Sequence, residues 1–215
     1  MIIDEQRTAR GLRTVAELLE LAEAGTIILD PYSVLLGTRV RLGEGNVLYP
    51  GVVIECDPDS SCELGSDNAL LPGTFIAASG GGSIVIGDNN RIGEGGARIM
   101  AGTAGAQVRI GDRTRLSSSP VIVAPVELGD GCQVLGQITA QQVQLAGGAA
   151  YSHPDPDHRG AVLKGFGKAR GLTLEVGEVV NGSGDFGTAP IERQRRYHPE
   201  APSLPAAPDA ASTSA

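Results

Sequence analysis

The sequence contains no tryptophan and few other aromatic residues. Phe and Tyr contribute 3 and 4 of the 215 residues, whereas Gly contributes 31. Globular cores usually obtain much of their buried area from aromatic side chains. A core without them has to be assembled from many small aliphatic contacts that repeat along the chain in a thin layer. The composition therefore favours a solenoid.

Long apolar runs and a basic excess are also missing. No apolar stretch approaches the roughly 18 residues that a membrane-spanning helix needs. The N-terminal sequence Met-Ile-Ile-Asp-Glu-Gln lacks the layout of a signal peptide. The net charge of −8 argues against a nucleic-acid partner, because such proteins carry a basic face. We predict a cytoplasmic protein without a membrane or nucleic-acid partner.

The sequence has only three cysteines, Cys56, Cys62 and Cys132. An odd number argues against a disulfide framework. Cys132 falls on a small inward position of the repeat described below, which predicts a core residue. Cys56 and Cys62 flank a loop and are able to bridge or to bind a metal, but two reduced thiols are favoured in the cytosol.

A period of six residues is the main feature that the sequence does contain. Seven of the ten residues at this step between Ser83 and Ala140 are Ile, Leu or Val. The step positions are Ile86, Ile92, Arg98, Ala104, Ile110, Leu116, Ile122, Leu128, Val134 and Ala140. Gly followed by an acidic residue often comes directly after the aliphatic residue, as in Gly87-Asp88. A fixed internal period predicts a repeat architecture, with these step positions facing inward.

The same step occurs earlier in the chain, where two excursions interrupt it. It runs through Leu36, Leu42, Leu48, Ile54, Leu64, Leu70 and Ile76. The excursions cover residues 55–62 and 77–82 and are rich in turn-forming residues. Six residues suit a short strand followed by a tight corner. Such short strands have to pair with the strand one turn later.

This pattern resembles the hexapeptide-repeat family of acyltransferases. The stretch from Leu42 to Ile54, Leu-Gly-Glu-Gly-Asn-Val-Leu-Tyr-Pro-Gly-Val-Val-Ile, is typical of it. The resemblance covers roughly residues 27–146. It implies an all-β solenoid, a left-handed parallel β-helix with three hexads per triangular turn, and usually a homotrimer. A repeated scaffold carries its function in its loops, so the motif specifies the fold better than the reaction.

The remaining segments complete the predicted organisation. The apolar spacing between Asp4 and Ala24 predicts a helix that caps the open end of the solenoid. The predicted segments are an N-terminal helix (1–25), the β-helix (26–146), an irregular, loop-rich C-terminal extension (147–198) and a tail (199–215). The tail is rich in Ala, Pro and Ser, which predicts disorder.

The candidate catalytic loop lies just after the repeat breaks. Residues 152–159 read Ser-His-Pro-Asp-Pro-Asp-His-Arg, and Gly165-Phe166-Gly167-Lys168 follows. This resembles the loop of maltose and galactoside O-acetyltransferases, although it is one residue shorter. The resemblance implies that His153 is the general base that deprotonates the acceptor. Asp155 is a predicted catalytic partner, because it or Asp157 is close enough in sequence to orient the imidazole.

The resemblance also implies acetyl-CoA, or another acyl-CoA, as the co-substrate. Lys164, Lys168 and Arg170 are the predicted cofactor-binding residues, since cations pair with phosphates. The alternative is a solvated charged face. In the acetyltransferases a proline follows the equivalent lysine, where this chain has Ala169, and the tryptophan that comes soon afterwards is absent.

Tyr151, Arg159 and Asn90 are the predicted substrate-binding residues, for a small polar acceptor such as a sugar. Asn90 also fits another role, because Asn at a small inward position often stabilises the corners of a solenoid. We predict no metal. His153 and His158 have a spacing that resembles γ-class carbonic anhydrases, but no histidine precedes residue 153 to supply the third ligand.

The sequence therefore predicts an acyltransferase that moves an acyl group from coenzyme A to a hydroxyl or an amine. Two alternatives stay open. One is a non-catalytic β-helix that serves as a scaffold or binding subunit, which the early loss of the repeat favours. The other is a divergent biosynthetic enzyme that keeps the scaffold and the His153 loop but does not use coenzyme A.

Overall fold

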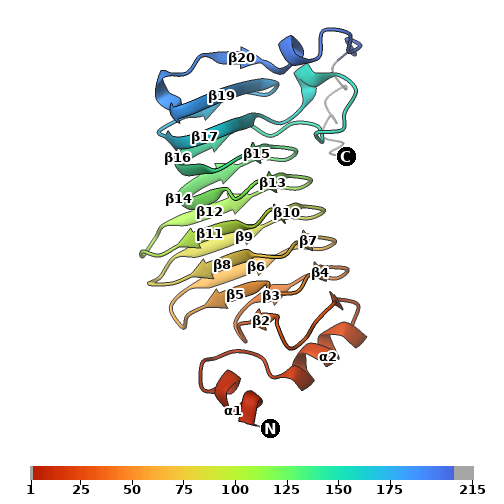
Figure 1. The fold of residues 1–215 in the computed structure, drawn as a ribbon, viewed down its shortest axis with the longest axis vertical. Coiled ribbons are helices and arrows are strands. Elements are labelled where there is room, and N and C mark those ends of the chain that lie inside the picture. The colour runs from red at the N-terminus through yellow and green to blue at the C-terminus, as the bar shows by residue number, and fades with distance from the viewer. Residues whose placement is uncertain (1, 206–215) are drawn as a thin grey trace, which may run out of the picture.

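The computed structural model describes residues 2–205, which form a three-sided parallel β-helix (Figure 1). Two short helices lie at the N-terminal end, and the strands then advance along the long axis of the molecule. Each of the early strands pairs with the strand three places later in the chain. Backbone hydrogen bonds therefore run along the axis. This architecture confirms the predicted all-β solenoid with a helical N-terminal cap.

The first face contains the strands that lead to the candidate site. It consists of β1 (Ile27–Ile28), β4 (Val47–Leu48), β7 (Ala69–Leu70), β10 (Arg91–Glu94), β13 (Arg115–Ser117) and β15 (Gln133–Leu135), followed by the first halves of β17 (Val162–Arg170) and β19 (Glu178–Asp185).

The second and third faces are built in the same way. The second consists of β2 (Leu35–Leu36), β5 (Val53–Cys56), β8 (Thr74–Ala78), β11 (Ala97–Ala101) and the first halves of β14 (Val121–Leu128) and β16 (Ile138–Leu145), with the second half of β17. The third consists of β3 (Arg41–Leu42), β6 (Ser61–Leu64), β9 (Ser83–Ile86), β12 (Gln107–Ile110), the second halves of β14 and β16, and β18 (Thr173–Leu174).

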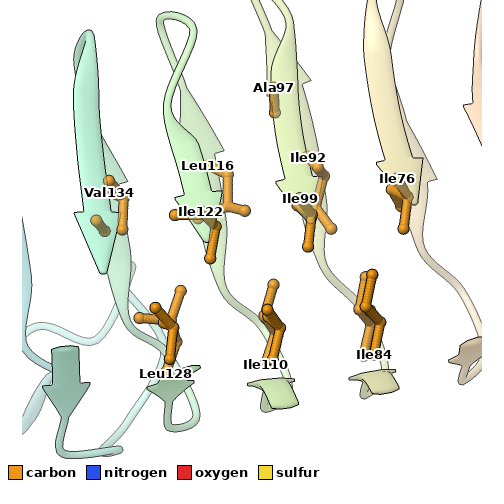
Figure 2. Close-up of a cluster of buried hydrophobic side chains, with 14 of the residues drawn as sticks. Ile76, Ile84, Ile92, Ala97, Ile99, Ile110, Leu116, Ile122, Leu128 and Val134 are labelled. Atoms are coloured by element: carbon orange, nitrogen blue, oxygen red, sulfur yellow. The ribbon is translucent and has the colours of Figure 1, made fainter. Parts of the chain in front are cut away.

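Stacked aliphatic side chains fill the interior between the three faces (Figure 2). Ile76, Ile99 and Ile122 occupy one register position in three successive coils of the second face, and all three are fully buried. Burying one such side chain contributes about 1.5–3 kcal/mol of transfer free energy. Many small increments along the axis thus replace the aromatic core that the composition lacks.

The six-residue period assigns the wrong residues to the core in one coil. It predicted Arg98 and Ala104 as inward residues, but both are exposed, and Ile99 fills the core position instead. The corner at 95–96 and the loop at 102–106 insert extra residues. The resulting spacings from Ile92 to Ile99 and from Ile99 to Ile110 add up to whole hexads. The six-residue period is therefore in phase again at Ile110, so the sequence alone does not reveal the shift of the core position to Ile99.

The N-terminal cap is two helices, α1 (Ile2–Thr8) and α2 (Val15–Glu23), where a single helix was predicted over residues 4–24. The chain turns between them at Gly11, which has a positive φ of 68°. A capping box then starts α2: the Glu17 amide donates to Thr14 Oγ1, and the Thr14 amide donates to Glu17 Oε2 at 2.7 Å. Leu18 on α2 is fully buried in the core, so this helix covers the end of the solenoid.

The solenoid continues beyond residue 146, where the sequence placed its end. Strand β17 pairs with β15 and β16, β18 pairs with β16, and β19 pairs with β17. The hexad count missed these strands because a long loop at 147–160 precedes them. The parallel coils therefore extend to Asp185.

A short segment closes the C-terminal end. Phe186 in η2 (Phe186–Thr188) is fully buried in the core. Strand β20 (Ile191–Arg193) then turns back antiparallel to β19, and η3 (Gln194–Tyr197) follows. Of the predicted disordered tail at 199–215, residues 206–215 lie outside the described residues.

The three cysteines are free thiols. Cys132 is fully buried in the core, as its repeat position predicted. Burial raises the pKa of both Cys62 and Cys132 to about 12, which makes these thiols poor nucleophiles. Within residues 2–205 there is no helix with the length and apolar character needed to cross a membrane.

Candidate active site

The loop at 147–160 replaces a tight corner between the third and first faces. In the preceding coils this corner is a four-residue turn such as 129–132. The base of the loop is hydrogen-bonded to the solenoid and to itself: the Gly148 amide donates to Asp130 O at 2.8 Å, and the Ala161 amide donates to Ala146 O at 3.1 Å. The Ala149 amide donates to His158 O at 2.7 Å. The coils thus hold both ends of the loop in register.

His153 lies half-buried in this loop, and main-chain atoms fix its ring. Its Nδ1 lies 3.0 Å from the carbonyl oxygen of Asp155 and 3.2 Å from the amide nitrogen of the same residue. If Nδ1 carries the proton, it donates to the carbonyl, and the Nε2 lone pair is free to accept a proton. Among the described residues no hydrogen-bond partner contacts Nε2.

The Asp155 carboxylate does not orient His153, contrary to the sequence prediction. Only its main chain contacts the imidazole. The carboxylate is buried and accepts hydrogen bonds from Arg195 Nη2 at 2.5 Å and from the Leu204 amide at 2.6 Å. It also lies 3.5 Å from Nδ1 of His158. The structure therefore gives this side chain a positioning role.

Asp157 extends these contacts into a cluster that clamps the loop to the C-terminal segment. Its carboxylate accepts from Arg195 Nε and from Arg193 Nη2, the latter at 3.2 Å. The hydrogen bond from the Leu204 amide is the main reason why the pKa of Asp155 lies below its ordinary value. The hydrogen bond from Arg195 is likewise the main reason why the pKa of Asp157 is lowered. Both carboxylates are thus ionised at neutral pH.

We expect this clamp to weaken in acid. The folded-state pKa values of Asp155 and Asp157 are lower than the ordinary 3.8, so the stabilisation is complete above that value and is lost as the pH falls through the folded pKa. Urea unfolding should therefore give a midpoint that falls more steeply between about pH 5 and pH 2 in the wild type than in Asp155→Asn. Equal slopes for the two proteins would contradict the clamp.

A pocket of about 260 Å³, which we call the loop pocket, opens beside the loop on the first face. Strands β15, β17 and β19 form its floor, and the loop and η3 form its rim. Its lining consists of Gln133, Leu135, Tyr151, Arg159, Val162, Lys164, Val179, Gln194, Tyr197 and His198. An apolar floor with a few polar groups around it is the usual form of a small-molecule site.

Three predicted site residues meet in this pocket: Tyr151, Arg159 and Lys164. Arg159 connects the pocket to His153, because its Nε donates to the carbonyl oxygen of His153 at 2.7 Å. Lys164 Nζ lies 6.0 Å from the centre of the Tyr197 ring, at the outer limit of a cation–π contact. The loop pocket and the His153 loop are therefore adjoining parts of one site.

The three predicted cofactor-binding cations do not form one cluster. Lys164 lies in the first-face half of β17, where it is in register with Leu135. Lys168 and Arg170 lie beyond the corner on the second face, in register with Thr139 and Gln141. Spacing along the sequence placed them together, but the corner of the solenoid separates them.

Asn90 is not available to a substrate, because only 2% of it is exposed. Its Oδ1 accepts hydrogen bonds from the amide of Thr114 at 2.7 Å and from the Thr114 hydroxyl at 2.8 Å. Asn68 supports the Asn90 amide in the same way, at 2.9 Å, and Asn46 supports Asn68 at 3.0 Å. The substrate role predicted for Asn90 is wrong, and the alternative of a corner-stabilising ladder is confirmed.

Among the lining residues that the sequence analysis did not select, three come from the C-terminal segment: Gln194, Tyr197 and His198. They follow the loop by roughly 40 positions in the sequence, and the antiparallel return of β20 brings them back to it. A hydrogen bond to Glu192 raises the pKa of Tyr197, so its hydroxyl stays protonated at neutral pH. The residues in the described range include no group of three or more His, Cys, Asp or Glu side chains placed to hold a metal ion.

Comparisons with known proteins give only distant structural matches. No protein-family model matches the chain, and no curated protein matches it either. One similar solved structure is PerB from Caulobacter crescentus in complex with CoA and GDP-perosamine, with 18% identity over 82% of this chain and a TM-score of 0.27. Another is a histidine-to-alanine variant of GDP-perosamine N-acetyl transferase from the same organism, also with CoA and GDP-perosamine, with 18% identity over 82% of this chain and a TM-score of 0.22.

The chain spans less than two thirds of the length of these two structures, 64% and 63% respectively. Similarity at this level carries no argument about the reaction. The case for a function therefore depends on the geometry of the His153 loop and the loop pocket.

Proposed function

We propose that this protein transfers an acyl group, in the simplest case acetyl, from coenzyme A to a hydroxyl or an amine of a small polar acceptor. One observation carries the proposal: Nδ1 of His153 is held by main-chain atoms of Asp155 at 3.0 and 3.2 Å, whereas Nε2 has no hydrogen-bond partner among the described residues. In the tautomer that carries its proton on Nδ1, Nε2 is free to act as a base. A general base close to neutral pH is what the acceptor of an acyl transfer needs.

The reaction is a direct transfer. Nε2 of His153 takes the proton of the acceptor hydroxyl or amine while the acceptor oxygen or nitrogen attacks the thioester carbonyl carbon. The carbon–sulfur bond then breaks, and the thiolate of coenzyme A leaves and takes up the proton. No covalent enzyme intermediate is required, which agrees with the high pKa of the buried thiols Cys62 and Cys132.

The loop pocket is the proposed acceptor site. Its volume of about 260 Å³ suits a small molecule, and Arg159 and Lys164 favour an acceptor with hydroxyl or anionic oxygens. Tyr151 at the rim offers an aromatic face of the kind against which a sugar ring packs. Because Arg159 also holds the carbonyl oxygen of His153, an acceptor bound in the pocket lies next to the loop that carries the base.

Acyl-CoA is the proposed co-substrate, and we assign the predicted cations to two different tasks. Lys168 and Arg170 both point outward from the second-face half of β17, where the phosphates of coenzyme A are able to pair with them. Lys164 belongs to the acceptor pocket. Phe166, with 62% of its surface exposed at the corner between them, offers an apolar contact for an extended cofactor.

We also propose a homotrimer. Leu35, Val53, Phe75 and Val121 lie in register on the outside of the second face and form an apolar stripe that Arg98 interrupts. Apolar side chains that gather on the outside of one face often mark an interface. Sedimentation velocity should then give three times the 22.0 kDa of the chain, and a monomer at micromolar concentration would contradict this.

Release of free coenzyme A from acetyl-CoA tests the proposed activity. The purified chain is incubated with acetyl-CoA and a panel of sugars, amino sugars and small alcohols, and the thiol is detected with a chromogenic disulfide. We expect release that depends on one class of acceptor. If no acceptor gives release above the background hydrolysis, the proposal is wrong.

The alternative of a non-catalytic scaffold loses its main support. The sequence favoured it because the repeat seemed to stop at residue 146, but β17, β18 and β19 continue the coils beside the His153 loop. A related enzyme without coenzyme A would be indicated by binding of the acceptor together with a failure to turn over acetyl-CoA.

A further inference from the structure

A second pocket lies at the opposite end of the solenoid from the His153 loop. It occupies about 540 Å³ between the N-terminal cap and the first coils of the third face. We call it the N-terminal pocket. Its lining consists of Arg13, Leu21, Thr38, Arg39, Val40, Arg41, Leu42, Ser60, Ser61, Cys62 and Glu63. It shares no residue with the loop pocket. The elements that line it, α2, β3 and β6, lie at the other end of the molecule from β17, β19 and η3, which line the loop pocket (Figure 1).

Positive charge predominates in this pocket. Three arginines line it, and Glu63 is the single acidic residue in the lining. The chain as a whole has a net charge of −8. Glu63 pairs with Arg41 at 2.7 Å, but both side chains are largely exposed, so this ion pair is weak. The pocket thus retains a positive excess in an acidic protein.

The arginines have unused hydrogen-bonding capacity. Nε of Arg13 is buried and has no hydrogen-bond partner among the described residues. Its Nη2 makes only a long contact of 3.5 Å with the carbonyl oxygen of Val40. Within residues 2–205, Arg39 forms no ion pair and no side-chain hydrogen bond. Guanidinium groups in this condition favour an anion with several oxygens, because their planar donors match phosphate geometry.

The remainder of the lining limits the kind of anion. Leu21, Val40 and Leu42 supply an apolar floor, and the hydroxyls of Thr38, Ser60 and Ser61 supply further donors. A bare ion would leave the floor unused. A phosphate attached to a ring or an aliphatic group would use both parts of the pocket.

We propose that the N-terminal pocket binds a small organic phosphate, with Arg39 and Arg13 holding the phosphate oxygens and the apolar floor holding the organic part. This site is independent of acyl transfer. It lies beside α2, whose Leu21 forms part of the lining, and a ligand there would join the helical cap to the first coils.

Calorimetric titration of the full chain with ADP, inorganic pyrophosphate and adenosine tests this proposal. ADP should bind, pyrophosphate should bind more weakly, and uncharged adenosine should not bind. Arg39→Gln should weaken ADP binding by about 10-fold or more, since a hydrogen bond to a charged group contributes about 1.5–3 kcal/mol. Glu63→Gln should strengthen it, because the variant releases Arg41 from a competing carboxylate.

Arg170→Gln is the matched control, since Arg170 is an exposed arginine of the proposed coenzyme A site and ADP resembles part of that cofactor. The proposal requires that Arg39→Gln weaken ADP binding both in the wild-type chain and in the Arg170→Gln background. If Arg170→Gln weakens binding and Arg39→Gln does not, ADP occupies the other site and the proposal is wrong. It is equally wrong if neither ADP nor pyrophosphate binds at millimolar concentration. The experiment contains no acyl-CoA, so its failure leaves the proposed acyl transfer untouched.

Discussion

His153→Ala is expected to lower the rate of acyl transfer by about 10²–10⁴-fold, the usual contribution of a positioned general base. The loss should appear in kcat, because the base acts when the acceptor is deprotonated and takes no part in holding the substrates. The loop should survive the change, since its clamp is formed by Asp155, Asp157 and Arg195 and does not involve the imidazole. Initial rates of thiol release at saturating acetyl-CoA measure the effect.

Two further variants make this test specific. Ser152→Ala changes an exposed neighbour in the same loop and should keep wild-type kinetics. His198→Ala changes the histidine of the loop pocket, so it should raise KM for the acceptor more than it lowers kcat. If His153→Ala keeps full activity and His198→Ala is inactive, the general base is His198 and not His153.

Ile99→Ala is expected to destabilise the folded chain by about 2–5 kcal/mol, the usual cost of truncating a fully buried aliphatic side chain. Ile99 is 0% exposed and stacks between Ile76 and Ile122. The cavity cannot close easily, because strands on either side hold the backbone of β11. Chemical denaturation monitored by circular dichroism gives the free energy of unfolding.

Arg98→Ala is the matched control, because the hexad rhythm assigned the core position to Arg98. Its side chain is exposed and lies 4.7 Å from the ring centre of Phe75. Loss of such an exposed cation–π contact costs about 0.5–1 kcal/mol. A larger loss of stability in Arg98→Ala than in Ile99→Ala would show that the rhythm of the sequence was right and the register of β11 wrong.

The solenoid was predictable because its core repeats at short range. Each inward aliphatic residue has a counterpart one hexad away, so a single sequence displays the pattern many times. The slip at Ile99 and the continuation past residue 146 were not predictable in this way. In both places the chain inserts residues at a corner, and strand pairing along the axis restores the register. That pairing joins residues about 20 or more positions apart, and a six-residue period in the sequence does not show which distant residues pair.

The candidate site was predictable only where its residues lie in one loop. His153, Arg159 and Tyr151 could be selected together because they lie in a short motif or directly beside it. The partners of Asp155 could not, because Arg195 and Leu204 lie 40 and 49 residues away. The short spacing between His153 and Asp155 suggested that the Asp155 carboxylate orients the His153 ring. The fold instead provides the Arg195 guanidinium and the Leu204 amide, which hold this carboxylate more strongly.

A different limit of sequence-based prediction concerns the direction of side chains along a strand, as shown by Lys164, Lys168 and Arg170. They alternate along β17, which predicts that they point to one side of a straight strand. The strand instead turns a corner at Gly165 and Gly167, both of which have positive φ angles. A Cβ at Gly165 would lie 1.9 Å from the carbonyl oxygen of Gly182, so glycine is required for the close approach of the coils there.

The role of His153 depends on which of its ring nitrogens carries the proton. Nitrogen NMR of the chain with ¹⁵N-labelled histidine distinguishes the two tautomers, when it is recorded at a pH above which the nitrogen shifts no longer change. A His153→Gln sample identifies the signals of this residue among the three histidines. We expect a protonated Nδ1, donating to the Asp155 carbonyl, and an unprotonated Nε2. A protonated Nε2, with Nδ1 accepting from the Asp155 amide, would contradict the proposal that Nε2 is the base.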